Sequence, residues 1–506
     1  MKTLERALRS APLTPDRTMT VDVTGTELKR GAFFNTIAIL ASNFRGVFTF
    51  LIARLLGPAA LGTFSVAWAA TDLISKIGIF GLDNAITTFI ARSEAVGDRA
   101  RSRALFRFAV AFGVGLSAGV ALLSVVAVRM LGERLGFPRE MVAALAVLFC
   151  AIPGVALYRI SIAVSRGVKV MQHDIYSRGM TEPIVTTLAF LIALGVGLVT
   201  FAPELAAIVG TAASGIVALA LAASLFRDLP AGKGILSFRG ETRNLIGYAA
   251  PIGAYQLLNT FIFRLDVIML GFFIGRAPGV TLATVGVYGA VVDVAGGLRK
   301  VNQAFNPIFA PVVAGMTATG EQEHAAATYA RLAQWMLWIL LPLVAVMALA
   351  GSTILLIFGP EFRQGGMWLG IVAAACATNA FVSLGETVIM VQRPGLNLIS
   401  SSIAGAVAIG ANLWLIPRFG VTGAAFGILV PYVVQGILRF AILRFIFRWR
   451  NPWSNMAPPV IATIMALIPA LICHALLPGI AGQLTAGVLF LVIFGMAWIW
   501  HFRFRR

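Results

Sequence analysis

Charged side chains are scarce in this sequence. Only 12% of its 506 residues are Asp, Glu, Lys or Arg, whereas 59% are hydrophobic. A soluble domain carries about 25% charged residues, so this deficit excludes an ordinary soluble fold and indicates an integral membrane protein. The apolar runs are long and lack the alternation of a transmembrane barrel. We therefore expect an all-α polytopic membrane protein.

Cysteine, histidine and long polar loops are also in short supply. The three cysteines lie far apart inside apolar segments and the four histidines form no metal set, so we expect no metal and no other cofactor. No phosphate-binding loop motif is present, which argues against ATP hydrolysis by the chain itself. The loops are too short to bury a core of their own. We therefore do not expect an enzyme.

Basic residues outnumber acidic ones, and the formal net charge is +19. In a polytopic membrane protein, basic cytoplasmic loops and anionic membrane lipid explain such an excess better than nucleic acid, which we do not expect as a partner. With the N-terminus inside, 25 of the 40 lysines and arginines lie in cytoplasmic segments and 6 in the opposite loops. Both termini are therefore predicted to be cytoplasmic.

About fourteen apolar segments have the length of roughly 20 residues that a membrane span needs. They cover residues 31–56, 61–83, 104–128, 141–164, 179–200, 205–226, 244–274, 284–311, 332–357, 367–391, 396–416, 422–443, 458–476 and 484–501. The predicted organisation is a cytoplasmic tail at 1–30, an N-lobe of six helices at 31–226, a cytoplasmic linker at 227–243, a C-lobe of six helices at 244–443, and accessory helices with a basic C-terminus at 444–506.

Short motifs recur half a chain apart. Leu-Gly-Thr-Phe at 61–64 matches Val-Gly-Val-Tyr at 285–288, and a nearby Leu-Leu-Gly recurs as Met-Leu-Gly. Lys76 and Lys300 each lie fourteen residues after the shared glycine. Chance recurrence in glycine-rich helices is the alternative, but the combined match favours two parallel repeats. That layout places a binding site between the two halves.

One stretch, residues 285–311, is apolar enough to span a membrane and yet carries several polar groups. They are Asp293, Arg299, Lys300, Asn302, Gln303 and Asn306. Ionisable groups at membrane depth are costly and normally face a protein interior or a wet cavity. We therefore expect this stretch to line a polar lumen, and the chain to be a transporter organised around it.

The predicted site combines cations, amides and acids from the segments around this lumen. The cations expected to bind substrate are Arg45, Lys76, Arg264, Arg299 and Lys300. The amides expected to hydrogen-bond with it are Gln256, Asn259, Asn302, Gln303 and Asn306. The acids considered as coupling sites for protons or sodium are Asp72, Asp266, Asp293, Glu182 and Glu386. The alternative for every one of these groups is a structural pairing that holds helices together.

Two of the expectations concern local contacts. Asp72 and Lys76 lie four residues apart, on one face of a helix, where they could neutralise each other. Arg159 lies near the inner end of its predicted span, and we expect its side chain to snorkel toward the membrane surface.

The stretch Arg-Leu-Leu-Gly-Pro-Ala-Ala-Leu-Gly-Thr-Phe at 54–64 resembles the signature of bacterial polysaccharide biosynthesis proteins, the oligosaccharide flippases. Residues 264–271 resemble the seventh helix of these proteins, and residues 416–425 resemble the start of their twelfth. Their superfamily also includes multidrug exporters and the lipid II flippase. The resemblance implies two six-helix lobes around a V-shaped cavity, with an accessory helix pair.

The main hypothesis is therefore a flippase for undecaprenyl-diphosphate-linked oligosaccharide in the bacterial inner membrane, working by rocking of two lobes. Arginine suits bidentate contacts with the diphosphate, and lysine supplies a point charge. Lipid-linked oligosaccharide and membrane lipid are the expected partners, with polysaccharide polymerase and glycosyltransferases as further candidates. The alternatives are a cation-coupled multidrug exporter, which needs an acidic or aromatic cavity, and a membrane polymerase or glycosyltransferase, which needs a sizeable outer loop.

Overall fold

The computed structural model describes residues 44–227, 239–302, 309, 313, 315–316, 321–449, 453–477 and 479–504. Within these residues every regular element is a helix and no strand occurs, which confirms the predicted fold class. Ten of the helical stretches are long and apolar enough to cross a membrane, judged by length and composition. The protein is therefore a multi-pass helical membrane protein.

The N-terminal half of the described chain runs to the end of α10. Its elements are α3 (Phe44–Ile79), α4 (Leu82–Ala95), α5 (Arg99–Leu131), α6 (Arg139–Leu148), η1 (Phe149–Ala151), α7 (Ile152–Gly167), α8 (Gln172–Asp174), the π-helical turn η2 (Ile175–Thr181), α9 (Glu182–Gly195) and α10 (Ala202–Ser224). Local signals explain several of the boundaries. The Asp98 side chain caps α5 by accepting from the backbone N–H of Arg101, and Pro203 lies in the first turn of α10.

The C-terminal half begins with α11. Its elements are α11 (Arg239–Phe272), α12 (Leu282–Gly296), α14 (Gln322–Leu349), α15 (Gly351–Leu355), η4 (Pro360–Gly365), α16 (Gly366–Gln392), α17 (Pro394–Ala441), η5 (Ile442–Ile446), α18 (Trp453–Leu476) and α19 (Gly479–Phe504). Thr281 and Thr284 form a capping box that starts α12.

Two pairs of predicted spans are joined in single bent elements. The first two predicted segments meet in α3 at Gly57, whose φ is 81°, and the eleventh and twelfth meet in α17 at Gly420, whose φ is 55°. Glycine adopts these angles without the steric cost that a Cβ atom brings. At Gly420 a Cβ would also lie 2.1 Å from the Pro278 carbonyl oxygen. The predicted count of fourteen spans stays a prediction.

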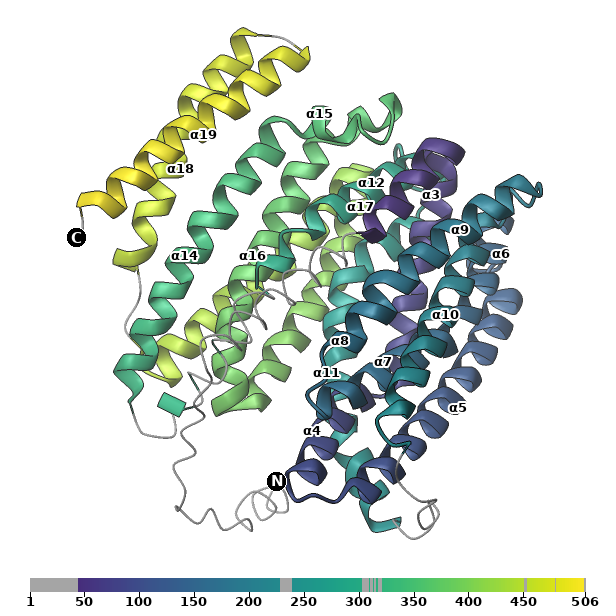
Figure 1. Ribbon diagram of the computed structural model, residues 1–506. Coiled ribbons are helices and arrows are strands. Elements are labelled where there is room, and N and C mark those ends of the chain that lie inside the picture. The colour runs from purple at the N-terminus through teal and green to yellow at the C-terminus, as the bar shows by residue number, and fades with distance from the viewer. Residues whose placement is uncertain are drawn as a thin grey trace.

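The two halves lie side by side, as Figure 1 shows. Helices α4 to α10 form one side, α14, α16 and α17 form the other, and α11 and α12 lie between them (Figure 1). The accessory pair α18 and α19 packs on α14, where Trp338 joins a small apolar core with Ala466 and Phe490. The pair thus extends the C-terminal half outward.

Helices α3 and α12 cross with their backbones in contact. A Cβ atom on Gly62 would lie 2.0 Å from the Leu282 carbonyl oxygen, and one on Gly286 would lie 1.7 Å from the Pro58 carbonyl oxygen. Small residues permit such an approach between helices in a membrane. The largest hydrophobic core surrounds this crossing and includes residues from both halves, such as Leu61 and Tyr288. The crossing brings the two predicted repeat motifs into contact. It also places α3 and α12 side by side, and both helices contribute side chains to the cavity described below.

Candidate functional site: a cationic cavity between the two halves

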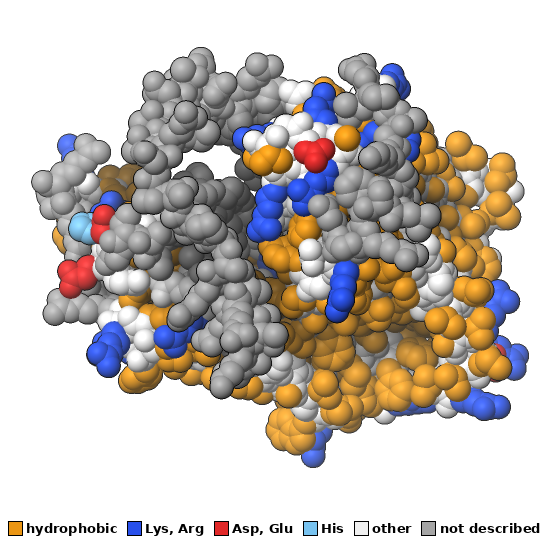
Figure 2. All heavy atoms as spheres, turned by 90° about the horizontal axis from the view of Figure 1, so that it is seen from below, with side chains coloured by type: hydrophobic (Ala, Val, Ile, Leu, Met, Phe, Trp, Pro, Cys, Tyr) orange, Lys and Arg blue, Asp and Glu red, His pale blue; other side chains and the backbone are white. Residues whose placement is uncertain are grey.

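A cavity of about 550 Å³ lies between the two halves of the described chain. Its charged lining residues are Asp72, Lys76, Arg159, Arg178, Arg264, Asp293, Arg299 and Lys300. Six of these side chains are basic and two are acidic, so the lining carries an excess of positive charge. We call this space the cationic cavity. Seen from below, lysine and arginine side chains gather beside a hollow on that face (Figure 2).

Asp72 is bound by two arginines. The Arg264 guanidinium donates to Asp72 Oδ2 from Nη2 at 2.9 Å and from Nε at 3.0 Å, and Arg159 Nη2 lies 3.6 Å from Oδ1. The expected local pairing with Lys76 is therefore wrong as the main contact of Asp72, because two guanidinium groups from α7 and α11 reach the carboxylate. Snorkelling of Arg159 is also wrong, since the side chain lines the cavity beside Asp72.

Arg299 and Lys300 follow the C-terminus of α12, and both line the cationic cavity. The Arg299 guanidinium carbon lies 3.6 Å from the centroid of the Phe263 ring, and its Nε donates to Asn379 Oδ1 at 3.2 Å. Both of these partners are uncharged, so the contacts orient the guanidinium without cancelling its charge. Lys76 lines the same cavity from α3 and is 9% exposed.

The predicted amides divide into separate environments. Asn259 lines the cationic cavity and accepts from the Ser401 hydroxyl at 3.4 Å. Gln256 donates to Asp83 at 3.2 Å, which joins α11 to α4. Asn302 is buried, and its side-chain oxygen has no hydrogen-bond partner among the described residues. Gln303, Asn306 and the side chain of Arg45 lie outside the described residues.

The five predicted coupling acids do not lie together. Asp72 and Asp293 line the cationic cavity, and Asp293 accepts from Thr49 at 2.8 Å. The remaining three have other neighbours: Glu182 lines a smaller adjoining chamber, buried Asp266 accepts from Tyr288 at 2.6 Å, and Glu386 accepts from Tyr255 and pairs with Arg439 at 3.0 Å. Their roles in coupling stay predictions.

Sequence reasoning missed two of the six cavity cations, Arg159 and Arg178. Arg178 falls in a stretch that was assigned to a loop, whereas the structure places it in the π-helical turn η2 and in the lining of the cavity. A usable signal was its position four residues before Glu182, because that spacing puts both side chains on one face of a helix.

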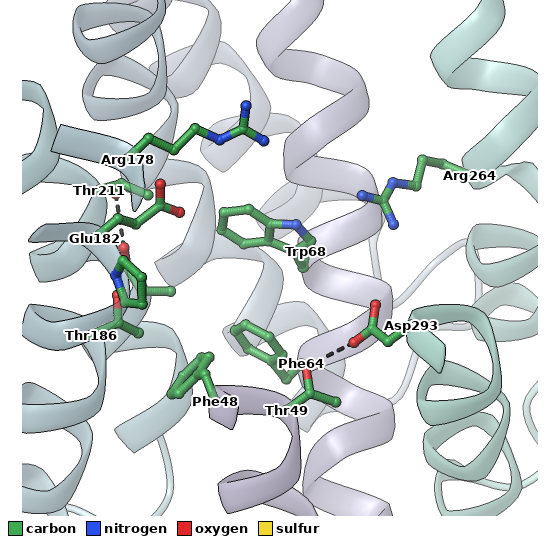
Figure 3. Close-up of a pocket in the computed structure, with 12 residues that line it drawn as sticks. Phe48, Thr49, Phe64, Trp68, Arg178, Glu182, Thr186, Thr211, Arg264 and Asp293 are labelled. Carbon is green, nitrogen blue, oxygen red and sulfur yellow. Dashed lines mark hydrogen bonds between the residues drawn. The ribbon is translucent and has the colours of Figure 1, made fainter. Parts of the chain in front are cut away.

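A smaller chamber of about 110 Å³ adjoins the cationic cavity, and Arg178, Arg264 and Asp293 line both spaces. Figure 3 shows Arg178 and Arg264 reaching toward each other from opposite sides, with Trp68 between them. The other lining residues are Phe48, Thr49, Phe64, Glu182, Pro183, Thr186, Ala207 and Thr211. We call this space the aromatic chamber.

The chemistry available here is recognition of an anion. Among the described residues, no group of three or more histidine, cysteine, aspartate or glutamate side chains is placed to hold a metal ion. Guanidinium and ammonium groups that converge on a cavity within apolar surroundings attract phosphate or carboxylate. Their mutual repulsion is reduced here by Asp72 and Asp293.

The described chain is thus a multi-pass helical membrane protein with two halves around a central cavity. Residues 28–313 match the family model described as Polysaccharide biosynthesis protein, and the chain belongs to that family. The resemblance seen in the sequence is thereby confirmed. No curated protein matches the chain.

Solved structures of transporters share this fold. The lipid II flippase MurJ in an inward closed conformation aligns with a TM-score of 0.70 at 11% identity, over 93% of this chain and 99% of that chain. An inward-facing multidrug resistance MATE family transporter of the MOP superfamily aligns with a TM-score of 0.67 at 13% identity, over 81% and 94%.

A MOP superfamily transporter from Pyrococcus furiosus Vc1, described as having a binding pocket of reverse polarity, aligns with a TM-score of 0.61 at 14% identity, over 83% of this chain and 95% of that chain. At these identities the three likenesses show that the chain shares the fold of these transporters.

Proposed function

We propose that this protein is a flippase that moves undecaprenyl-diphosphate-linked oligosaccharide across the bacterial inner membrane during synthesis of a surface or exported polysaccharide. The observation that carries the proposal is the lining of the cationic cavity, with six basic and two acidic side chains. Membership of the polysaccharide biosynthesis family supports it. In this role the protein receives its substrate from membrane glycosyltransferases and delivers it to a polymerase.

The physical problem that such a flippase solves is desolvation. A diphosphate bearing sugars loses its hydration when it enters hydrocarbon, and this is prohibitively costly without compensating contacts. Arginine and lysine side chains in a wet cavity replace that hydration with charge-assisted hydrogen bonds. Arg299 and Lys300 are well placed for this, because they line the cavity and Arg299 is oriented by uncharged neighbours.

The charge of the cavity also argues against the alternative substrate, an organic cation carried by a multidrug exporter. A drug exporter of the same fold that carries organic cations needs acidic or aromatic walls to attract them. Here basic side chains outnumber acidic ones by six to two, and Asp72 is engaged by Arg264 and Arg159. Such a lining repels a cation and attracts an anion, so we favour the flippase.

The proposed transport cycle is alternating access. The two halves rock against each other so that the cavity faces one leaflet and then the other, while the polyprenyl tail stays in the bilayer. The glycine crossing of α3 and α12 and the ion pair of Asp72 with Arg264 both join the two halves. In this mechanism they are contacts that form and break during the cycle.

The test is the double variant Arg299→Ala with Lys300→Ala, reconstituted in vesicles with a fluorescent prenyl-diphosphate-linked sugar. We expect the rate of translocation to fall at least about tenfold, because two charge-assisted contacts to the diphosphate are lost. The same variant should abolish surface polysaccharide in cells that depend on this protein, while the protein still inserts and accumulates.

The matched control removes two cations elsewhere. Arg129→Ala with Arg134→Ala changes two exposed arginines outside the cavity and lowers the net charge by the same amount. We expect this variant to translocate at the wild-type rate. Wild-type transport by the Arg299 and Lys300 variant, or equal loss in both double variants, would contradict the proposed function.

A further inference from the structure

One aromatic ring in the cationic cavity carries two of its arginines. Phe263 of α11 lines the cavity. The guanidinium carbon of Arg299 lies over the Phe263 ring at 3.6 Å from the centroid, and that of Arg264 lies over it at 4.9 Å. Cations are attracted to the face of an aromatic ring within about 6 Å of its centroid. Phe263 therefore holds two cations, one from α11 and one from the turn that follows α12.

The two arginines differ in their other contacts. Arg264 donates to Asp72 at 2.9 Å and 3.0 Å, so a carboxylate offsets part of its charge. Arg299 donates from Nε to Asn379 Oδ1 at 3.2 Å, and its Nη1 and Nη2 make no hydrogen bond or ion pair with the residues that the structure describes. Stacking covers the face of a guanidinium and leaves the N–H donors at its edge accessible. Arg299 therefore keeps two donor nitrogens for a ligand.

The contacts of Arg299 lie within one half of the protein. Helix α11 supplies the Phe263 ring, α16 supplies the Asn379 amide, and α12 packs against both helices. Leu298, which precedes Arg299, is 2% exposed and belongs to the large hydrophobic core, so the turn that carries Arg299 is anchored. Rocking of the two halves in the proposed cycle does not require any of these contacts to break.

A fixed guanidinium binds phosphate more tightly than a mobile one. Arginine has many rotamers, and ordering one such side chain on binding weakens the affinity by about two- to tenfold. Phe263 and Asn379 already restrict Arg299 before a ligand arrives, and neither carries a charge that would repel or replace an anion. A phosphate can then accept two parallel hydrogen bonds from Nη1 and Nη2.

We propose that Phe263 is a positioning residue of the substrate site. Its ring holds Arg299 so that Nη1 and Nη2 form a bidentate contact with one phosphate of the lipid-linked diphosphate. The inference rests on the proposed function. Because Phe263 acts through Arg299, its replacement should weaken binding only while Arg299 is present. A ring that merely filled space in the cavity wall would matter equally with and without that arginine.

The experiment measures binding of farnesyl diphosphate, a soluble prenyl diphosphate, to the purified full chain by titration calorimetry. Phe263→Leu should lower the affinity about fivefold, because Arg299 must then be ordered by the ligand. Phe263→Tyr keeps the ring and should bind as the wild type does. The matched control is Phe89→Leu, which changes a half-buried phenylalanine outside the cavity lining that carries Arg92 at 5.8 Å. This control should bind with wild-type affinity.

A double-mutant cycle separates positioning from packing. In an Arg299→Ala background, Phe263→Leu should cause no further loss of affinity. Phe263→Met fills a similar volume without a ring and should lose about as much as Phe263→Leu, so it supplies the answer if the leucine variant does not fold. The contrast between Phe263→Tyr and Phe263→Met decides the question if Arg299→Ala binds too weakly to measure.

The outcomes distinguish the two proposals. Wild-type affinity in both Phe263→Leu and Phe263→Met would overturn the role of Phe263 and leave the cationic cavity as a diphosphate site. The same conclusion follows from an equal loss in the Arg299→Ala background, or from a loss in Phe263→Tyr as large as that in Phe263→Met. Absence of farnesyl diphosphate binding to the wild type would overturn the proposed function, and the positioning role with it.

Discussion

Asp72 and Arg264 form an ion pair that joins the two halves of the protein. Arg264 Nη2 lies 2.9 Å from Asp72 Oδ2, and 192 residues separate the two in the chain. Their side chains are 17% and 16% exposed, so water screens the pair only in part. The contact lies in the wall of the cationic cavity, where Arg264 also faces the aromatic chamber. In the proposed function, a substrate phosphate would compete with Asp72 for the Arg264 guanidinium.

A double-mutant cycle measures this pair. Asp72→Asn and Arg264→Gln should each lower the unfolding free energy, and the double variant should lose less than the sum. We expect a coupling energy of about 1–3 kcal/mol from thermal unfolding in detergent. The pair Arg166 and Asp174 has a similar distance of 3.0 Å but is 42% and 32% exposed, and its coupling should stay below about 1 kcal/mol. Equal coupling energies in the two pairs would contradict the conclusion that water screens the Asp72 and Arg264 pair less than the exposed pair.

The crossing of α3 and α12 predicts a specific steric effect. Gly286→Val places side-chain atoms against the backbone of Pro58, which cannot move aside as a flexible side chain would. We expect a loss of about 3 kcal/mol or more, seen as a lower melting temperature. Gly115 lies on α5 with open space around its Cβ position, so Gly115→Val is the control. A similar melting temperature for the two variants would show that the helices do not cross so closely.

The buried Arg439 predicts a large cost for removing one charge. Its side chain is 2% exposed and pairs with Glu386 at 3.0 Å. Arg439→Met leaves Glu386 without its ionic partner and should lose about 3–5 kcal/mol of stability, whereas Arg444→Met at an exposed position should lose little. Replacing both members of the pair by methionine should recover part of the loss. Equal stability of the single and double variants would argue against the ion pair.

The hydrogen bond between Tyr288 and Asp266 predicts a smaller effect. Both side chains are buried, and the second oxygen of Asp266 has no partner among the described residues. Tyr288→Phe removes the donor to Oδ2 and should cost about 1–3 kcal/mol. Tyr176 is 50% exposed, and Tyr176→Phe should have no measurable effect on thermal unfolding. A stable Tyr288→Phe variant would mean that Asp266 finds another donor.

Local patterns were enough to predict much of this protein. Long apolar runs with few charges predicted a helical membrane protein, because hydropathy is a property of neighbouring residues. The motif at 54–64 indicated the family that the comparison confirms. The polar groups of the stretch 285–311 were predicted to face a polar lumen, and the side chains of Arg299 and Lys300 within it line the cationic cavity.

Pairing between distant residues was not predictable in the same way. The helix face of Asp72 suggested Lys76 as its partner, but the closest cations are Arg264 and Arg159, contributed by α11 and α7. Arg178 was missed because its membership of the cavity depends on the packing of η2 against other helices.

Composition and local periodicity by themselves therefore determined that this chain spans a membrane as helices and carries costly charges within them. Only the tertiary structure decided which charges share one cavity and which acids they meet there. The physical reason is that the cost of burying a charge in a membrane follows from the residue and its neighbours along the sequence. Ion pairs, in contrast, act over a few ångströms between helices that lie far apart in the chain.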